Sequence, residues 1–202
     1  ADGAPVSKHD SLFTIAWNSL HYDLNTSTTE SRFVFTSIRK TDICVGTLEA
    51  LWRYLAWSFG VLSQGSSPSH NWLGLPEPNG GQPLAGGWKA SCVQVRGDWE
   101  FYASALGLPS WQNASNCCWL CEASEMNWAY AGTDASWRGT IRSRDFFLEE
   151  ATALGEDACV LFRIFNLRVE GVMIDTLHVV DQGVASRTIA NLFYRMCETI
   201  RH

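Results

Sequence analysis

The sequence has 202 residues, of which 46% are hydrophobic and 18% charged, and its formal net charge is −6. This length is typical of one domain, or of one domain with a compact second lobe. The apolar content is sufficient for a hydrophobic core and excludes a disordered chain. The acidic balance argues against a strong nucleic-acid binder, which usually carries a basic excess or a basic stripe.

Features that report on cellular compartment point to an intracellular protein. The best apolar run, residues 48–62, is too short for a membrane span and contains Glu49 and Arg53. The chain begins with Ala and shows no secretory signal, so a processed product or a fragment is expected. Seven cysteines, an odd number, fit poorly with a fully paired secreted scaffold. We expect these thiols to be mostly reduced, and the ten tryptophans to serve mainly in core packing.

The first half of the chain predicts a hairpin followed by a helix. Residues 11–20 and 32–38 are rich in β-forming residues, and the polar stretch between them predicts an antiparallel pair. Residues 47–64 carry apolar residues at helical spacing, and Gly65 is expected to end that helix. Residues 65–87 are rich in Gly, Ser, Pro and Asn and predict a long loop.

The next segment predicts a third strand, residues 88–96, in the same mixed sheet, with helix 47–64 packed on one face. A helix should begin directly after it, with Asp98 near its N-cap. The remaining elements are an irregular Cys-containing segment, a helix, an apolar segment that fits a strand or a helix, and a final helix from about Val184 (residues 110–124, 143–154, 158–167 and 184–200).

Two aspartates are candidates for binding a hard cation. Asp98 follows a predicted strand, where a carboxylate suits Mg²⁺ or Mn²⁺, and the alternative is a simple helix cap. Asp2 lies at the beginning of the chain, and its alternative is a frayed terminus.

A second set of candidates suits zinc. Cys118 and Cys121 form a C-x-x-C pair, which is half of a tetrahedral zinc site, and unreactive loop or buried thiols are the alternative. Asp175, His178 and Asp181 follow one another at spacings of three, which would form one stripe on a helix. That stripe suits a metal site or a buried polar cluster, and the alternative is a strand end followed by a helix that Asp181 caps.

Five segments together resemble one family of enzymes. ADGAP, SIRKTDIC, VRGDWEFYASALG, CCWLC and MIDTLHVVDQGV are similar to segments of the DDE-type transposases of cut-and-paste DNA elements, especially the CACTA-like group and proteins derived from it. The resemblance implies an α/β fold, with a ribonuclease-H-like mixed sheet, flanking helices and a Cys-containing, mostly helical insertion. It divides the chain into a core with a truncated first strand, residues 1–110, and a region ending in the D-x-x-H segment, residues 111–202.

The resemblance also implies roles for individual residues. Asp2 would be the first catalytic acid and Asp98 the second, and Asp181 takes the third position without clear context, since Glu198 is the only other acid after His178. These carboxylates would hold Mg²⁺ or Mn²⁺ for phosphodiester chemistry on DNA.

The remaining motifs would be structural. In this family pattern, Cys118, Cys121, His178 and Asp175 hold the fold together or bind zinc. The implied partner is DNA and the implied location is the nucleus, and the fragment is expected to be inactive as given. The alternative is a transposase-derived domain that serves as a non-catalytic structural or protein-interaction subunit. A zinc-stabilised scaffold unrelated to transposases is a third interpretation.

Overall fold

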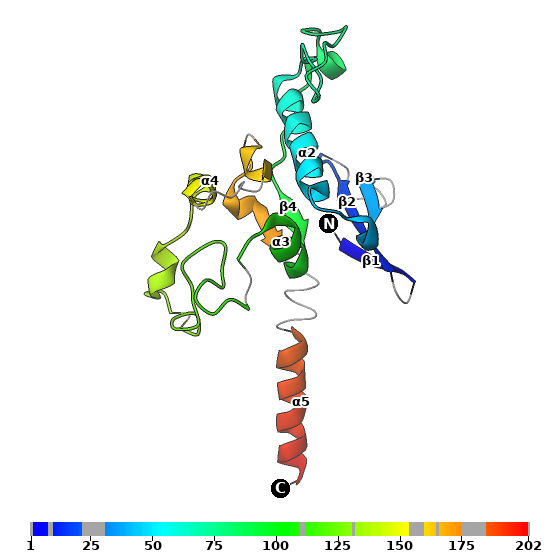
Figure 1. Ribbon diagram of the computed structural model, residues 1–202. Helices are drawn as coiled ribbons and strands as arrows, with labels where there is room; N and C mark the ends of the chain where they lie inside the picture. Colours follow the sequence, from blue (N-terminus) through cyan, green and yellow to red (C-terminus); the bar gives the residue numbers. More distant parts are fainter. Residues whose placement is uncertain are drawn as a thin grey trace.

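The structure is a computed structural model that describes residues 2–7, 10–21, 31–109, 112–130, 132–153, 160–164, 166–174 and 185–201. The strands are β1 (Asp2–Ser7), β2 (Asp10–Trp17), β3 (Phe33–Arg39), β4 (Val95–Gly97) and β5 (Val172–Ile174). The α-helices are α2 (Thr47–Gln64), α3 (Trp99–Leu106), α4 (Arg144–Ala153) and α5 (Ser186–Arg201). Short 3-10 turns lie between them at Lys40–Asp42, Leu84–Gly87, Ser136–Gly139, Val160–Arg163 and Val169–Gly171. The chain is therefore a mixed α/β protein, as expected (Figure 1).

The predicted hairpin is confirmed and forms part of a three-stranded antiparallel sheet. The order is β1-β2-β3, and Phe13 of β2 lies opposite Ile38 of β3. Phe13 is buried in the core, whereas Thr14, on the other face, shares a 2.8 Å hydrogen bond with Ser37. One apolar and one polar face is the usual arrangement of an antiparallel sheet.

The prediction that residues 88–96 join this sheet is wrong. Only Val95–Gly97 form a strand, β4, and it pairs in parallel with β5 in a separate two-stranded sheet. Residues 88–94 belong to no strand. The partner of β4 lies far along the chain, so local alternation of side chains cannot reveal which sheet the segment joins.

The helix predicted at residues 47–64 is confirmed at both ends. Gly65 ends α2 in the left-handed conformation, with φ 70°, and its N–H donates to the carbonyl of Val61 at 3.2 Å. The following loop, residues 65–87, folds back on itself through bridges such as Ser66 with Pro83, and it covers the end of α2 farthest from the sheets (Figure 1).

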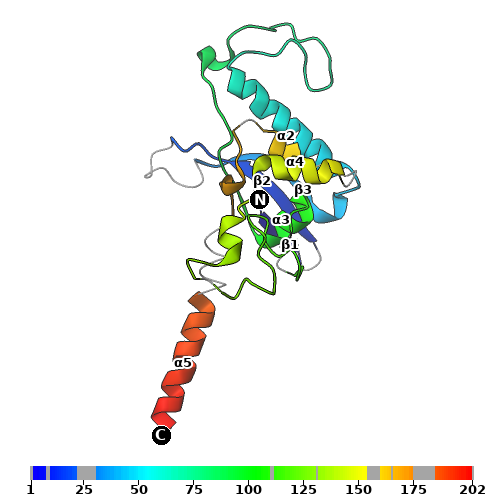
Figure 2. The same ribbon diagram turned by 90° about the vertical axis from the view of Figure 1, so that its left-hand side faces the viewer.

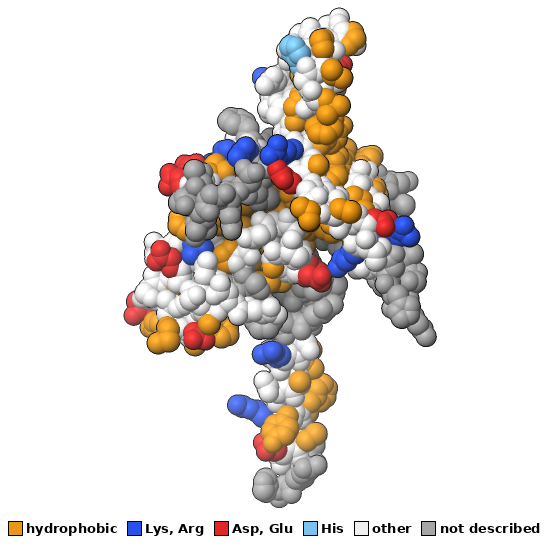
Figure 3. All heavy atoms as spheres, viewed as in Figure 1, with side chains coloured by type: hydrophobic (Ala, Val, Ile, Leu, Met, Phe, Trp, Pro, Cys, Tyr) orange, Lys and Arg blue, Asp and Glu red, His pale blue; other side chains and the backbone are white. Residues whose placement is uncertain are grey.

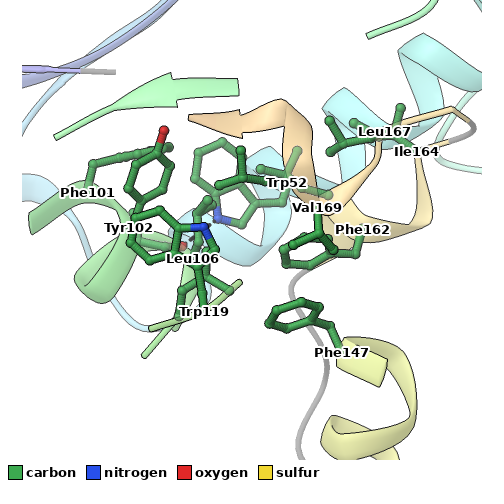
Figure 4. Packing of buried hydrophobic residues seen from close by; sticks show 14 of the residues in the cluster. Trp52, Phe101, Tyr102, Leu106, Trp119, Phe147, Phe162, Ile164, Leu167 and Val169 are labelled. Atoms are coloured by element: carbon green, nitrogen blue, oxygen red, sulfur yellow. Dashed lines mark hydrogen bonds between the residues drawn. The ribbon is translucent and has the colours of Figure 1, made fainter. Parts of the chain in front are cut away.

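One hydrophobic core joins the two sheets, and its residues come from both sides of position 110 (Figure 4). Trp52 of α2 lies edge-on to Phe13 of β2 and Phe101 of α3, with ring centroids 6.4 and 6.1 Å away. Its indole N–H donates to the carbonyl of Ala105 at 2.9 Å. Phe162 stacks on Phe147 of α4 at 4.9 Å. Helix α2 thus packs against β2 and α3 together.

Fewer tryptophans serve the core than the sequence suggested. Of the nine that the structure describes, only Trp52 and Trp119 are buried, and four are exposed. Several exposed aromatic rings contact each other: Trp17 stacks on Phe33 at 4.7 Å, and Trp72 lies edge-on to Tyr54. The aromatic residues therefore cover part of the surface as well as the interior.

The helices of the second half are confirmed, and the ambiguous apolar segment is neither strand nor α-helix where it is described. Helix α4 begins at Arg144, where Ser143 Oγ accepts from the Phe146 N–H at 3.3 Å, and residues 160–163 form a 3-10 turn. Helix α5 extends away from the rest of the chain in both views (Figures 1 and 2). Among the described helices, none is long and apolar enough to cross a membrane.

Candidate functional site

Asp98 occupies the position between β4 and α3. Its backbone is extended, and Oδ1 accepts a hydrogen bond from the Phe101 N–H at 2.6 Å, so the predicted N-cap is confirmed. A carboxylate has two oxygens and about four acceptor sites, and the cap uses only one of them. Asp98 can therefore cap α3 with Oδ1 and still offer Oδ2 to a cation.

The strand end that carries Asp98 is held rigidly against α3. Tyr102 of α3 is fully buried, and its hydroxyl donates to the carbonyls of Val95 in β4, at 3.1 Å, and of Met173 in β5. Gly97, the last residue of β4, lies so close to the Phe101 ring that a Cβ there would overlap it. Glycine at position 97 thus allows the helix to approach the strand.

Asp2 is the first residue of β1, whereas the family pattern places the first acid at the end of a strand. Its backbone pairs with Thr14, and the adjacent Gly3 pairs with Phe13. The Phe13 ring stacks on Phe101 of α3, with centroids 6.1 Å apart. The beginning of β1 lies beside α3 in both ribbon views (Figures 1 and 2). Strand β1 thus lies in the sheet that packs on α3, whereas Asp98 follows a strand of the separate β4–β5 pair, so Asp2 and Asp98 are not on neighbouring strands.

The C-x-x-C thiols are neighbours in space. Cys121 is buried, and its thiol interacts with that of Cys118, while the N–H of Leu120 lies 3.4 Å from Cys118 Sγ. Burial, followed by the hydrogen bond and charge of Cys118, raises the pKa of Cys121, although a backbone hydrogen bond with Ala123 and the charge of Arg142 oppose this. Cys117 Sγ instead donates to the Ala123 carbonyl at 3.1 Å, so this thiol has a partner other than Cys118 and Cys121.

Trp119, between the two cysteines, was not among the candidates from sequence. It is only 3% exposed, and its ring lies 4.7 Å from that of Trp99 and 4.9 Å from that of Tyr102, both in α3. The C-x-x-C segment therefore rests directly on the helix that Asp98 caps. The only hint in the sequence was a large aromatic residue placed between the two cysteines, and this does not indicate which residues it contacts.

Three predicted site residues, Asp175, His178 and Asp181, lie outside the described residues. The strand before them, β5, ends at Ile174, and Ile174 is the parallel partner of Gly97. Each of these paired residues is followed in the sequence by an aspartate, Asp175 or Asp98. Within the part of the chain that is described, no three His, Cys, Asp or Glu residues are grouped to hold a metal.

Zinc binding by Cys118 and Cys121 remains a prediction, with His178 and one further cysteine as the expected remaining ligands. We expect close to one equivalent of zinc, lost in Cys118→Ser and Cys121→Ser and retained in the control Cys44→Ser, whose thiol is exposed. Metal analysis of the purified protein tests this, and less than about one tenth of an equivalent would reject the site.

The pH dependence of zinc affinity provides a second test. Zinc binds thiolates, and the raised pKa of Cys121 keeps that thiol protonated at neutral pH. Binding must therefore release protons, and affinity should fall as the pH is lowered, by up to about tenfold per pH unit for each proton released. An affinity independent of pH between neutral and mildly acidic conditions would show that the thiols are not ligands.

The other described histidines offer no competing site. His70 lies in the loop of residues 65–87, where Nδ1 is 3.0 Å from the hydroxyl of its neighbour Ser69, and it is exposed. His21 is also exposed. Of the predicted site residues, the structure thus describes Asp2, Asp98, Cys118 and Cys121, and among these it shows contact between the two thiols. Comparison of the chain with protein-family models, with curated proteins and with solved structures found no match.

Proposed function

We propose that the chain is part of a transposase-like domain with a ribonuclease-H-like sheet, in which Asp98 binds Mg²⁺ or Mn²⁺ beside a DNA phosphate. The observation that carries this proposal is the position of Asp98, at the carboxyl end of a strand in a parallel pair. In open α/β sheets, ligands bind outside the carboxyl ends of the strands. Oxygen ligands suit magnesium and manganese.

The arrangement of the first half supports the same proposal. An antiparallel hairpin, helix α2 and then β4 follow one another in the order of the family pattern, although β4 pairs with β5 and not with the hairpin. Cleavage and strand transfer use two cations about 3.5–4 Å apart, which clamp the attacking and leaving oxygens. Asp181 is the proposed third acid. A nuclear location follows from this role.

We expect the chain as given neither to cut nor to join DNA at a useful rate with Mg²⁺. Asp2 and Asp98 can hold one ion loosely, whereas in-line phosphoryl chemistry uses a pair. DNA affinity should be weak and strongly salt-sensitive, because phosphate binding uses Lys and Arg, and acidic residues outnumber these 21 to 15. A supercoiled-plasmid nicking assay with Mg²⁺ and with Mn²⁺ checks this. Nicking that Asp98→Ala abolishes would instead establish an active nuclease.

Two substitutions of Asp98 separate its two roles. Asn caps a helix as well as Asp does, so Asp98→Asn should leave the free energy of unfolding nearly unchanged, whereas Asp98→Ala should lower it by about 1 kcal/mol. Both should reduce Mn²⁺ affinity by at least about tenfold, because each removes the charged ligand. Isothermal titration measures the affinity, and urea denaturation measures the stability.

The matched control for this pair is Asp42→Asn. Asp42 is an exposed carboxylate whose partner in the described part is Arg39, at 2.9 Å, and its loss should change neither quantity appreciably. Asp175→Asn belongs in the same series, because the sequence places Asp175 directly after Ile174. Equal Mn²⁺ affinity in the parent and in Asp98→Asn would show that Asp98 is a helix cap alone.

The exposed face of α5 favours a second candidate, a non-catalytic subunit that binds another protein. The described side chains of α5, residues 186–198, are all exposed. Ile189, Leu192, Phe193 and Met196 share one face at helical spacing, and Figure 3 shows hydrophobic side chains along this helix. An uncovered apolar stripe of this kind marks an interaction site.

This second candidate predicts that the stripe mediates association. Sedimentation of the parent should show either self-association or a partner-dependent complex that Leu192→Asp with Phe193→Asp abolishes. The control Tyr194→Ser changes an equally exposed residue that lies off the stripe. Unchanged association in the double variant would remove the interaction role of α5.

A further inference from the structure

We propose that Trp119 is the positioning residue for Asp98: its ring holds the first turn of α3, and with it the carboxylate at the end of β4. The role of Asp98 as a cation ligand rests on the function proposed above. The contact between Trp119 and α3 stands on its own geometry. No motif in the sequence connects these two residues, which belong to different segments.

Trp119 contacts the start of α3. Trp99 is the first residue of α3, directly after Asp98, and Tyr102 lies three residues later, so both side chains share one face of the first turn. The Trp119 ring is within 5 Å of both rings, at 4.7 and 4.9 Å between centroids. Figure 4 shows Trp119 beside Tyr102 and Leu106. Trp119 therefore contacts the turn whose N–H Asp98 caps.

The backbone around Trp119 is held by Arg142. Arg142 holds the segment on either side of the ring: its Nη1 donates to the carbonyl of Cys118 at 3.2 Å, and its backbone N–H donates to that of Leu120 at 2.8 Å. The guanidinium of Arg142 also lies over the ring of Phe146 in α4, 4.8 Å from its centroid. The backbone on both sides of Trp119 is thus held by Arg142, which contacts α4, while the Trp119 ring contacts α3.

Tyr102 connects α3 to β4 and β5. Tyr102, which contacts Trp119 through its ring, binds the carbonyls of Val95 and Met173 through its hydroxyl. Loss of the Trp119 ring would leave a cavity on one side of Tyr102 and Trp99, and the surrounding groups relax only partly into such a cavity. We expect the first turn of α3 to open more often, which would make the direction of the Asp98 carboxylate less defined.

Amide hydrogen exchange on the full chain tests the proposal, with α2 as the internal reference. In Trp119→Ala, amides of α3, including that of Phe101, should exchange at least about tenfold faster, while those of α2 stay within about twofold of the parent. Trp119→Phe should bring the exchange of α3 most of the way back to that of the parent, because it keeps an aromatic ring against Trp99 and Tyr102. It makes the ring smaller, but the indole N–H that is lost has no hydrogen-bond partner in the described part of the chain. The control is Trp128→Ala, at a 62% exposed position in the same segment, and it should leave amide exchange in α2 and α3 unchanged.

Mn²⁺ affinity is the second measurement and separates this inference from the proposed function. Trp119→Ala should weaken Mn²⁺ binding several-fold, and Trp119→Phe should not. Equal acceleration of exchange in α2 and α3, or no change in α3, would overturn the positioning role, since Trp119 would then be an ordinary core residue. Equal Mn²⁺ affinity in the parent and in Asp98→Asn would overturn the proposed function. In that case, amide exchange in α3 would still show whether Trp119 holds the helix cap.

Discussion

Replacing Trp52 with alanine is expected to lower the free energy of unfolding by about 3–5 kcal/mol, the usual cost of removing a buried aromatic side chain. Trp52 is only 4% exposed and contacts the rings of Phe13 in β2 and Phe101 in α3. Its indole also donates to the Ala105 carbonyl at 2.9 Å. The substitution therefore creates a cavity and leaves a buried acceptor without its donor at the junction of both sheets.

Urea denaturation followed by far-ultraviolet circular dichroism measures this change. Trp88→Ala is the matched control, because Trp88 is 82% exposed, and it should change stability by no more than about 0.5 kcal/mol. A loss below about 1 kcal/mol in Trp52→Ala would mean that α2 does not form a common core with β2 and α3.

Tyr102→Phe is expected to destabilise the protein by about 1–3 kcal/mol, although it removes a single oxygen atom. The side chain is fully buried, and its hydroxyl is a donor to the carbonyls of Val95 and Met173, one on each strand of the parallel pair. Without that donor, the ring still packs, but the two carbonyls that share its single proton lose it. The β4–β5 pair should loosen, and the Mn²⁺ binding proposed for Asp98 should weaken with it.

The same denaturation experiment applies, with Tyr194→Phe as control, because Tyr194 is 65% exposed on α5 and its change should be near zero. Hydrogen exchange at β4 and β5 adds a local readout. Parent-like stability of Tyr102→Phe would show that the hydroxyl does not hold the two strands, and the short parallel sheet would need another explanation.

Local sequence signals predicted elements whose ends depend on nearby residues. The helix at 47–64 has an apolar face at regular spacing and a glycine that adopts φ 70° directly after it, so both its existence and its end are encoded locally. The cap of α3 is likewise local, since Asp98 and the Phe101 N–H are three residues apart. The hairpin of β2 and β3 was also predictable, because two segments rich in β-forming residues and the polar connection between them lie close together in the sequence.

Sheet membership and the neighbours of the candidate site required the tertiary structure. Residues 88–96 alternate like a strand, yet only Val95 and Arg96 among them pair, together with Gly97, and their partner β5 comes from much later in the chain. In the same way, Asp98 was a candidate from its place after a strand, but nothing in the sequence indicated that Trp119 packs on the helix it caps. The C-x-x-C spacing predicted half of a zinc site, and the structure shows that the Cys118 and Cys121 thiols interact.

By itself, the sequence determined the mixed α/β class, the bounds of α2 and the cap at Asp98, because the helix end and the cap depend on residues a few positions apart. The tertiary structure alone decided that β4 leaves the hairpin sheet for β5, and that the C-x-x-C segment supports α3 through Trp119. The physical reason is that a buried aromatic side chain, or an unpaired strand backbone, gains free energy from any partner of suitable shape. Which distant partner is chosen depends on how the whole chain packs.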